Sequence, residues 1–230
     1  MKGLLRFFLG VALLPACWGA ARVLIDALLI ATGREGGFSV EAVSLLAGMV
    51  SFILAWCALP HPVRTYVLGH ELTHALWGLA FGARASDLRI GENGGSVRLT
   101  KTNLLITLAP YFFPFYTFVV IIAALITFAF LRPLPYLPLW MFAIGFTWAF
   151  HVLFTLETLT ERQPDVKAYG RLFSWTFIFL ANIALVLVWL AATTGLSFTE
   201  LWGLCQARLA APYLKIWAWT RALLASLWTR

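Results

Sequence analysis

Long apolar runs, separated by short polar or proline-containing segments, make up most of this chain. A run of about 20 apolar residues is long enough to cross the hydrocarbon layer of a bilayer as a helix. Six such helices are predicted, over residues 4–30, 41–59, 63–81, 104–131, 137–159 and 172–192. Pro110 and Pro114 interrupt the fourth, and because proline removes backbone hydrogen bonds we expect a kink or an unwound turn there.

Two stretches depart from this pattern. Residues 87–100 alternate apolar and polar side chains on either side of a glycine-containing turn at 92–95, which predicts a short β-hairpin. Residues 198–230 mix tryptophan with lysine and arginine, as one or two helices lying in the membrane interface do, with Pro212 dividing them. The predicted fold is an all-α polytopic membrane protein with a short β-hairpin and a C-terminal interfacial amphipathic region.

The chain shows no internal repeat and no low-complexity linker, which favours one membrane domain over residues 1–230. Within it we expect two accessory helices (1–60), a core (63–170), a further transmembrane helix (171–197) and interfacial helices (198–230). The N-terminal apolar run is too long for a typical signal-peptide core, so a retained helix is expected, with a cleaved signal as the alternative. Arg22 and Asp26, four residues apart in that run, form either an ion pair within the helix or a contact to another helix.

Composition supports a membrane location. The chain is 61% hydrophobic and 12% charged, whereas a soluble domain has about 25% charged residues. We expect an integral, multi-pass protein of a bacterial inner (plasma) membrane. The net charge of +7 fits loop topology and contact with anionic lipids, and no nucleic-acid motif accompanies it. The three cysteines are far apart, so neither a disulfide framework nor a cysteine zinc site is expected.

The candidate chemistry lies in the third predicted helix, which contains the motif H-E-x-x-H at residues 70–74. Residues four apart share one face of a helix, so His70 and His74 can direct imidazole nitrogens at one metal ion. Glu71 is rotated away from that face and is better placed to accept a proton from water than to bind the metal. Zinc suits two imidazoles and a third protein ligand, with a fourth position left for water.

A third ligand has to come from later in the chain. Two spans after the motif, the chain returns to the side of the membrane where the motif helix ends, at residues 160–170. Asp165 lies in this stretch, and Gln163-Pro164 would break the helix and let its carboxylate turn inward. Connectivity therefore favours Asp165, and the remaining candidates are Glu157, Glu161 and His151.

These features resemble the site-2 protease family of intramembrane zinc metallopeptidases. The resemblance rests on His70-Glu71-x-x-His74 in an apolar helix, the hairpin after it, and an aspartate beside a proline two spans later. Leu108-Ala109-Pro110 also stands where that family often has Ala-Gly-Pro. The similarity covers about residues 63–170 and implies a three-helix metallopeptidase-like core with Asp165 as the third zinc ligand. The aspartate here is followed by Val166, whereas the family usually has glycine.

The predicted function is that of a zinc-dependent intramembrane endopeptidase. Zn²⁺ would be held by His70, His74 and Asp165, Glu71 would be the catalytic base, and the substrate would be a membrane-spanning or membrane-proximal polypeptide. The alternative is a non-proteolytic binding or assembly subunit that keeps the fold. The small size and the missing Asp-Gly favour that alternative, whereas Glu71 argues against it, since a structural zinc site needs no base. A homo-oligomer or a partner membrane protein is compatible with either function.

Overall fold

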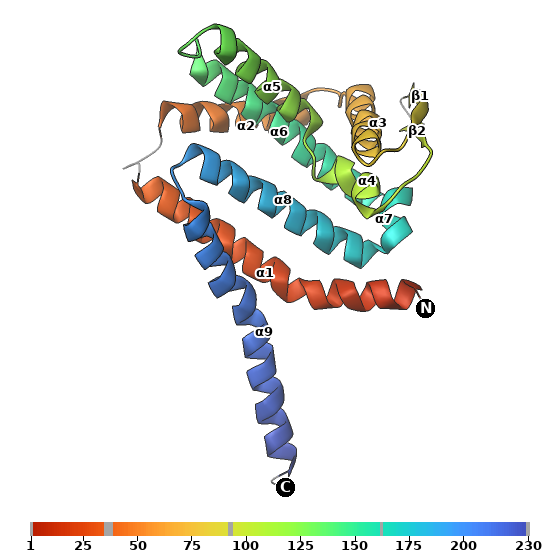
Figure 1. Cartoon of the computed structure of the whole chain (residues 1–230), viewed down its shortest axis with the longest axis vertical. Helices are drawn as coiled ribbons and strands as arrows, with labels where there is room; N and C mark the ends of the chain where they lie inside the picture. Colours follow the sequence, from red (N-terminus) through yellow and green to blue (C-terminus); the bar gives the residue numbers. More distant parts are fainter. Residues whose placement is uncertain (1, 35–38, 92–93, 162, 229–230) are drawn as a thin grey trace. The chain divides into compact units, whose positions relative to one another are not determined.

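The structure, a computed structural model, describes residues 2–34, 39–91, 94–161 and 163–228 (Figure 1). The chain forms two compact units, one of Met1–Gly37 with Tyr169–Arg230 and the other of Phe38–Ala168. The first contains α1 (Lys2–Arg34), α8 (Arg171–Thr193) and α9 (Phe198–Trp228). The second contains α2 (Val40–Ala58), α3 (Val63–Ala80), β1 (Ala85–Gly91), β2 (Gly94–Leu99), α4 (Leu104–Leu108), the 3-10 helix η1 (Ala109–Tyr111), α5 (Phe115–Phe130), α6 (Leu137–Thr160) and nearly all of α7 (Pro164–Tyr169). The two predicted accessory helices thus fall in different units, and the predicted division at residues 60, 170 and 197 stays a prediction.

The mostly helical fold is confirmed, with helices long and apolar enough to cross a membrane, but six spans are not. Among the described residues, four helices are long and apolar enough to cross a membrane: α1 (over Gly3–Gly33), α2, α6 and α8. A fifth span results if α4–η1 and α5, which meet at an angle of 82°, are counted as one. This bend confirms the break predicted at Pro110 and Pro114. The motif helix α3 is not among these spans, because His70, Glu71 and His74 lower its hydropathy.

The predicted hairpin is present as an antiparallel pair of strands, β1 and β2, which follows α3 directly. The predicted turn includes residues 92 and 93, which lie outside the described residues. The register shifts between Ser86 and Arg89, where Asp87 has a positive φ of 51°. This irregularity is a bulge, which increases the local twist of the strand pair. The hairpin packs against α3 (Figure 1), and Gly94–Val97 of the hairpin line the same cavity as the two motif histidines.

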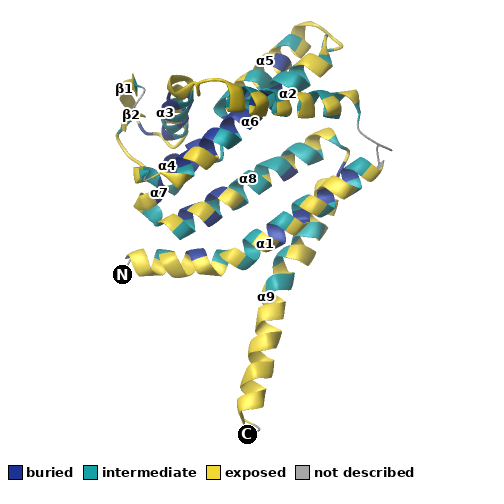
Figure 2. Cartoon of the chain, turned by 180° about the vertical axis from the view of Figure 1, so that it is seen from behind, coloured by how far each residue is buried: buried dark blue, intermediate teal, exposed yellow. Residues whose placement is uncertain are grey.

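In the first unit, α1 packs against both α8 and α9 around Val23, Ala27, Leu187 and Leu201. Asp26 pairs with Arg208 of α9 at 2.6 Å, so its partner belongs to another helix. The prediction that Pro212 divides the C-terminal region was wrong, because α9 continues through it. The Tyr213 hydroxyl donates to the Ala12 carbonyl at 2.7 Å and ties α9 to α1 next to the proline. Beyond this contact the side chains of α9 are exposed (Figure 2), and their interfacial location stays a prediction.

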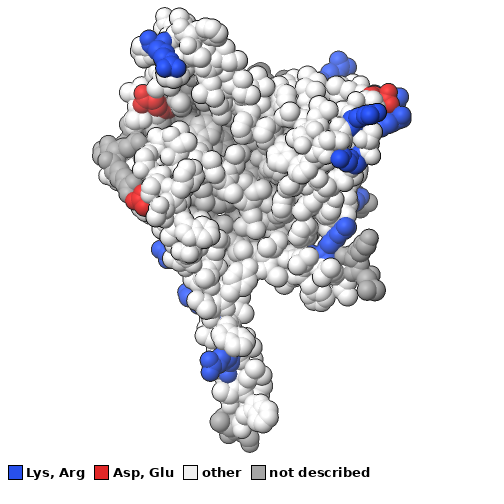
Figure 3. Space-filling model, viewed as in Figure 1, with Lys and Arg blue, Asp and Glu red and all other residues white. Residues whose placement is uncertain are grey.

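The surface agrees with helices that face lipid. Figure 3 shows broad areas without lysine, arginine, aspartate or glutamate, and charged side chains occur as small separate groups. Many of the exposed residues of α1 and α2 are large and apolar, for example Leu5, Phe8, Val50 and Leu54. In water such areas would be unusually large for a monomeric protein. In a bilayer they are the expected contact with hydrocarbon.

The second unit is built on a close contact between α2 and α6. Gly48 of α2 lies against the Phe142 carbonyl, and Gly145 of α6 lies against the Leu45 carbonyl. A Cβ atom at either glycine would overlap the backbone of the facing helix. Small residues at such crossings let two helices approach closely. Next to the crossing, Phe52 packs on Phe150 of α6, and this contact also joins α2 to α6.

Gly145→Ala should therefore destabilise the protein, by about 1–3 kcal/mol, because the added methyl group must push α2 and α6 apart. The measurement is the thermal unfolding midpoint of the purified protein in detergent. The matched control is Gly203→Ala in α9, where no other described part of the chain, the helix's own backbone aside, lies within 4 Å of the added Cβ. There alanine should be neutral or stabilise the helix by up to about 1 kcal/mol. Equal midpoints for the two variants would contradict this packing.

Candidate metal centre

Helix α3 presents His70 and His74 to a cavity on one of its faces. Their side chains are only 11% and 12% exposed, and their ring centroids lie 4.9 Å apart, as i and i+4 positions require. The helix is held on two sides. Gly69 packs against the Tyr116 ring of α5, and Gly78 packs against Leu99 of β2. Both glycines allow the close approach that leaves the two imidazoles fixed between the hairpin and the bent α4–η1 and α5 segment.

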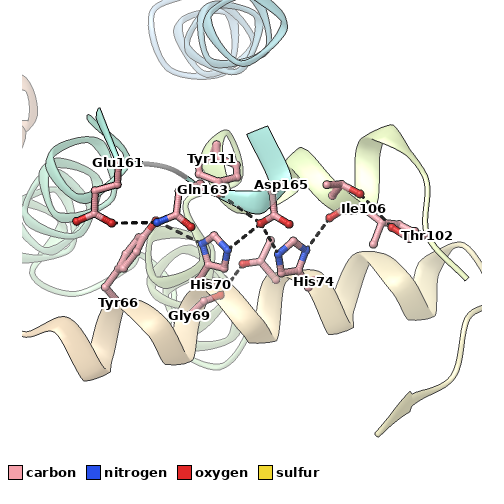
Figure 4. Close-up of polar contacts among 12 residues, drawn as sticks. Tyr66, Gly69, His70, His74, Thr102, Ile106, Tyr111, Glu161, Gln163 and Asp165 are labelled. Atoms are coloured by element: carbon pink, nitrogen blue, oxygen red, sulfur yellow. Dashed lines mark hydrogen bonds and ion pairs between the residues drawn. The ribbon is translucent and has the colours of Figure 1, made fainter. Parts of the chain in front are cut away.

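The structure brings Asp165 to the two histidines (Figure 4). Pro164 begins α7, and Asp165 in its first turn directs a carboxylate oxygen toward both imidazoles. Its Oδ2 lies 3.5 Å from Nε2 of His70 and 3.3 Å from Nε2 of His74. One ligand atom from each of the three residues lies within 4.8 Å of the others. In the part of the chain that the structure describes, this is the group of histidine, cysteine and acidic residues able to hold a metal ion.

These separations fit a shared metal ion better than direct hydrogen bonds. Hydrogen bonds between a charged nitrogen donor and a carboxylate measure about 2.7–2.9 Å. In a tetrahedral zinc site with ligand bonds of about 2.0–2.1 Å, neighbouring ligand atoms are about 3.3–3.4 Å apart. The two observed separations, 3.3 and 3.5 Å, match that tetrahedral spacing. The three side chains therefore could hold a metal ion, and two of their separations fit ligands of one tetrahedral ion.

The other atoms of these side chains are held by neighbouring groups. Nδ1 of His74 lies 2.8 Å from the Ile106 carbonyl of α4, to which it donates, so Nε2 keeps its lone pair for a metal. Nδ1 of His70 lies 3.3 Å from the Tyr66 hydroxyl. The Tyr111 hydroxyl donates to Oδ2 of Asp165 at 3.3 Å. Partners of this kind orient metal ligands and strengthen metal binding.

The two histidines also set the charge state of Asp165. Burial would raise the pKa of this carboxyl group, but the neighbouring imidazoles of His70 and His74 have the opposite effect and outweigh it. The pKa of Asp165 is therefore held well below its usual range. Asp165 is a carboxylate at neutral pH, which is the form that binds metal ions.

A cavity of about 840 Å³ opens over the three residues, and Glu71 also lines it. The Glu71 side chain is buried, 7% exposed, and its carboxyl group interacts electrostatically with His74 and Asp165. On its other side is β2, where a Cβ at Gly95 would meet Cγ of Glu71 and the Arg89 carbonyl at 2.8 Å. The hairpin therefore lies directly on Glu71 and keeps its carboxyl group in the cavity.

The alternative third ligands lie elsewhere. Glu157 and Glu161 line the same cavity, but neither belongs to the three-residue group. Oε1 of Glu157 is 3.5 Å from Nδ1 of His61, and Glu161 accepts a hydrogen bond from Gln163 at 3.0 Å. His151 is buried on α6 and lines a separate cavity of about 20 Å³, which His70 also lines. The histidines are thus grouped with Asp165, as connectivity favoured, and the role of each residue in metal binding stays a prediction.

Sequence reasoning missed the partners of the ligands. Tyr66 stands four residues before His70, on the same helix face, and that spacing was a usable signal. Tyr111 follows Pro110 in the bent segment, where the sequence predicted only a kink. The Ile106 carbonyl had no signal at all, because a backbone acceptor is the same in every residue.

Comparisons with protein-family models, with curated proteins and with solved structures found no match for this chain.

Proposed function

We propose that this protein is a zinc-dependent endopeptidase that hydrolyses peptide bonds of membrane-spanning or membrane-proximal polypeptides. The observation that carries the proposal is the meeting of His70, His74 and Asp165 at metal-ligand spacing, with Glu71 in the same cavity. A structural zinc site needs no base beside its ligands, whereas a hydrolytic site does. We further propose that the protein resides in a bacterial inner membrane.

The donor set favours zinc. Two imidazoles and one carboxylate are the protein ligands of many hydrolytic zinc sites. His70, His74 and Asp165 would hold the ion, with its fourth position open toward the cavity. Zinc, when bound, lowers the pKa of water toward neutrality and polarises the carbonyl group of the scissile bond.

Glu71 acts as the general base in the proposed reaction. Its carboxylate accepts a proton from the attacking water and then delivers it to the amine that leaves. The Ile106 carbonyl and the Tyr66 hydroxyl keep the two imidazoles in one orientation during these steps. Each of these groups belongs to the second unit of the fold, and the proposed chemistry needs no residue from the first.

The substrate would bind in an extended form. A transmembrane helix has its backbone groups hydrogen-bonded internally, so it must unwind locally before a peptide bond can be attacked. The strand β2 lines the cavity along Gly94–Val97, and the sheet in the described part of the chain has two strands. A peptide that adds to the second edge of β2 would lie across the cavity beside Glu71.

Metal removal tests this proposal. The purified protein should contain about one zinc ion per chain by elemental analysis, and should cleave single-span model polypeptides reconstituted with it in vesicles. A chelator should abolish cleavage, since His70, His74 and Asp165 alone neither polarise the carbonyl nor activate water. Added zinc should restore cleavage. Mass spectrometry of the products measures both the loss and the recovery of cleavage. Zinc-free protein after metal-replete preparation, or cleavage that survives zinc removal, would refute the proposal.

A further inference from the structure

His151 is a buried polar group that has no role in the proposed chemistry. It lies in the middle of α6, is 6% exposed, and its Nε2 is without a hydrogen-bond partner in the described part of the chain. A buried nitrogen with no partner lowers the stability of a fold, and polar groups in membrane-spanning helices are energetically costly. If position 151 only filled space in the core, an apolar side chain would be more stable there than histidine. This position therefore points to a polar role.

The other ring nitrogen of His151 has a partner, the backbone carbonyl of Tyr111 in η1. Because Nε2 is the unpartnered nitrogen, Nδ1 is the donor in this hydrogen bond. The Tyr111 carbonyl lies at the bend between α4–η1 and α5. Pro114, three residues later, has no N–H to offer to this carbonyl, and His151 contributes one.

Tyr111 is in turn a partner of the metal centre. Its side chain is fully buried, its hydroxyl donates to Oδ2 of Asp165 at 3.3 Å, and its ring centroid lies 5.3 Å from that of His70. The main chain of Tyr111 is therefore tied to α6, and its side chain contacts Asp165. Movement of η1 would carry the hydroxyl away from the Asp165 carboxylate.

We propose that His151 is a positioning residue of the metal centre, which fixes the backbone of η1 so that the Tyr111 hydroxyl stays on Asp165. The proposal rests on the metal site of the proposed function. It assigns no ligand role to His151. Its consequence is that His151 affects zinc affinity through Tyr111, although it does not touch the ion.

A double-mutant cycle on zinc affinity tests this inference, with affinity measured by competition against a chelator. His151→Leu should weaken zinc binding about tenfold, at the lower end of the 10–100-fold range for partners of metal ligands. His151→Asn, whose amide nitrogen can take the place of Nδ1, should restore most of the affinity. In a Tyr111→Phe background, His151→Leu should change the affinity little further, because the hydroxyl through which it acts is gone.

The control is Thr147→Val, one turn earlier on α6. Thr147 lines the same small cavity, but its hydroxyl donates to the Ala143 carbonyl of its own helix, so zinc affinity should not change. If His151 had only a packing role, His151→Leu would lower the unfolding midpoint of the zinc-free protein and leave zinc affinity unchanged. Alternatively, His151→Leu and Tyr111→Phe would weaken zinc binding by independent amounts that add in the double variant. Either result would overturn the inference and leave the proposed function standing. A wild-type protein that binds no zinc would overturn both.

Discussion

Glu71→Gln should lower peptide-bond hydrolysis by a factor of about 100 to 10,000, the usual contribution of a general base, and leave zinc content at the wild-type level. The amide has the shape of the carboxyl group, so the packing against Gly95 is kept. It is not basic, so it can neither accept a proton from water nor return one to the leaving amine. Zinc should stay, because Glu71 is outside the ligand group of His70, His74 and Asp165.

The measurements are single-turnover cleavage of a reconstituted model polypeptide and zinc content of the same preparation. Glu157→Gln is the matched control, because it makes the same change in a carboxyl group that lines the same cavity. Its effect should be less than about tenfold, well below the range for a general base. If Glu71→Gln cleaves the polypeptide at the wild-type rate, Glu71 is not the general base. Loss of its zinc would assign Glu71 a structural role, as the assembly-subunit alternative requires.

The sequence could predict the helices and the motif because both depend on local patterns. Apolar length predicts a membrane helix, and a separation of four residues places His70 and His74 on one face. The hairpin was also visible, since alternating side chains around a glycine-containing turn form a local pattern. The number of spans was less certain for a physical reason: the groups that give α3 its chemistry also make it too polar to qualify by hydropathy.

What the sequence could not predict depends on contacts between distant residues. Asp26 pairs with Arg208, 182 positions away, although Arg22 was available one turn earlier. Connectivity favoured Asp165 as the third ligand, but it left Glu157, Glu161 and His151 open as alternatives. That choice depends on the direction of α7 after Pro164. The three-dimensional arrangement of the helices decides which of these residues meet, and it cannot be deduced from a single sequence.

Asp165→Ala should remove zinc at the concentrations at which the wild type retains it. The variant loses one of the three proposed ligands and the negative charge that would offset the charge of the ion. Changes in the partners of ligands weaken binding about 10–100-fold, and loss of a ligand should exceed about 100-fold. His70→Ala should have a similar effect. The measurement is zinc per chain by elemental analysis, together with chelator competition for any residual binding.

Glu161→Ala is the control for Asp165→Ala, since Glu161 lines the same cavity and is four residues earlier in the chain. The Glu161 variant should keep its zinc, because in the structure Glu161 accepts a hydrogen bond from Gln163 and the two histidines are grouped with Asp165. Zinc retained in Asp165→Ala and lost in Glu161→Ala would move the third ligand to the end of α6. Zinc retained in both would mean that the two histidines bind the ion with some other partner, so the 3.3 and 3.5 Å separations would not mark a ligand set. Loss in the Asp165 variant alone would make the carboxylate after Pro164 the third ligand, even without the glycine that usually follows it in site-2 proteases.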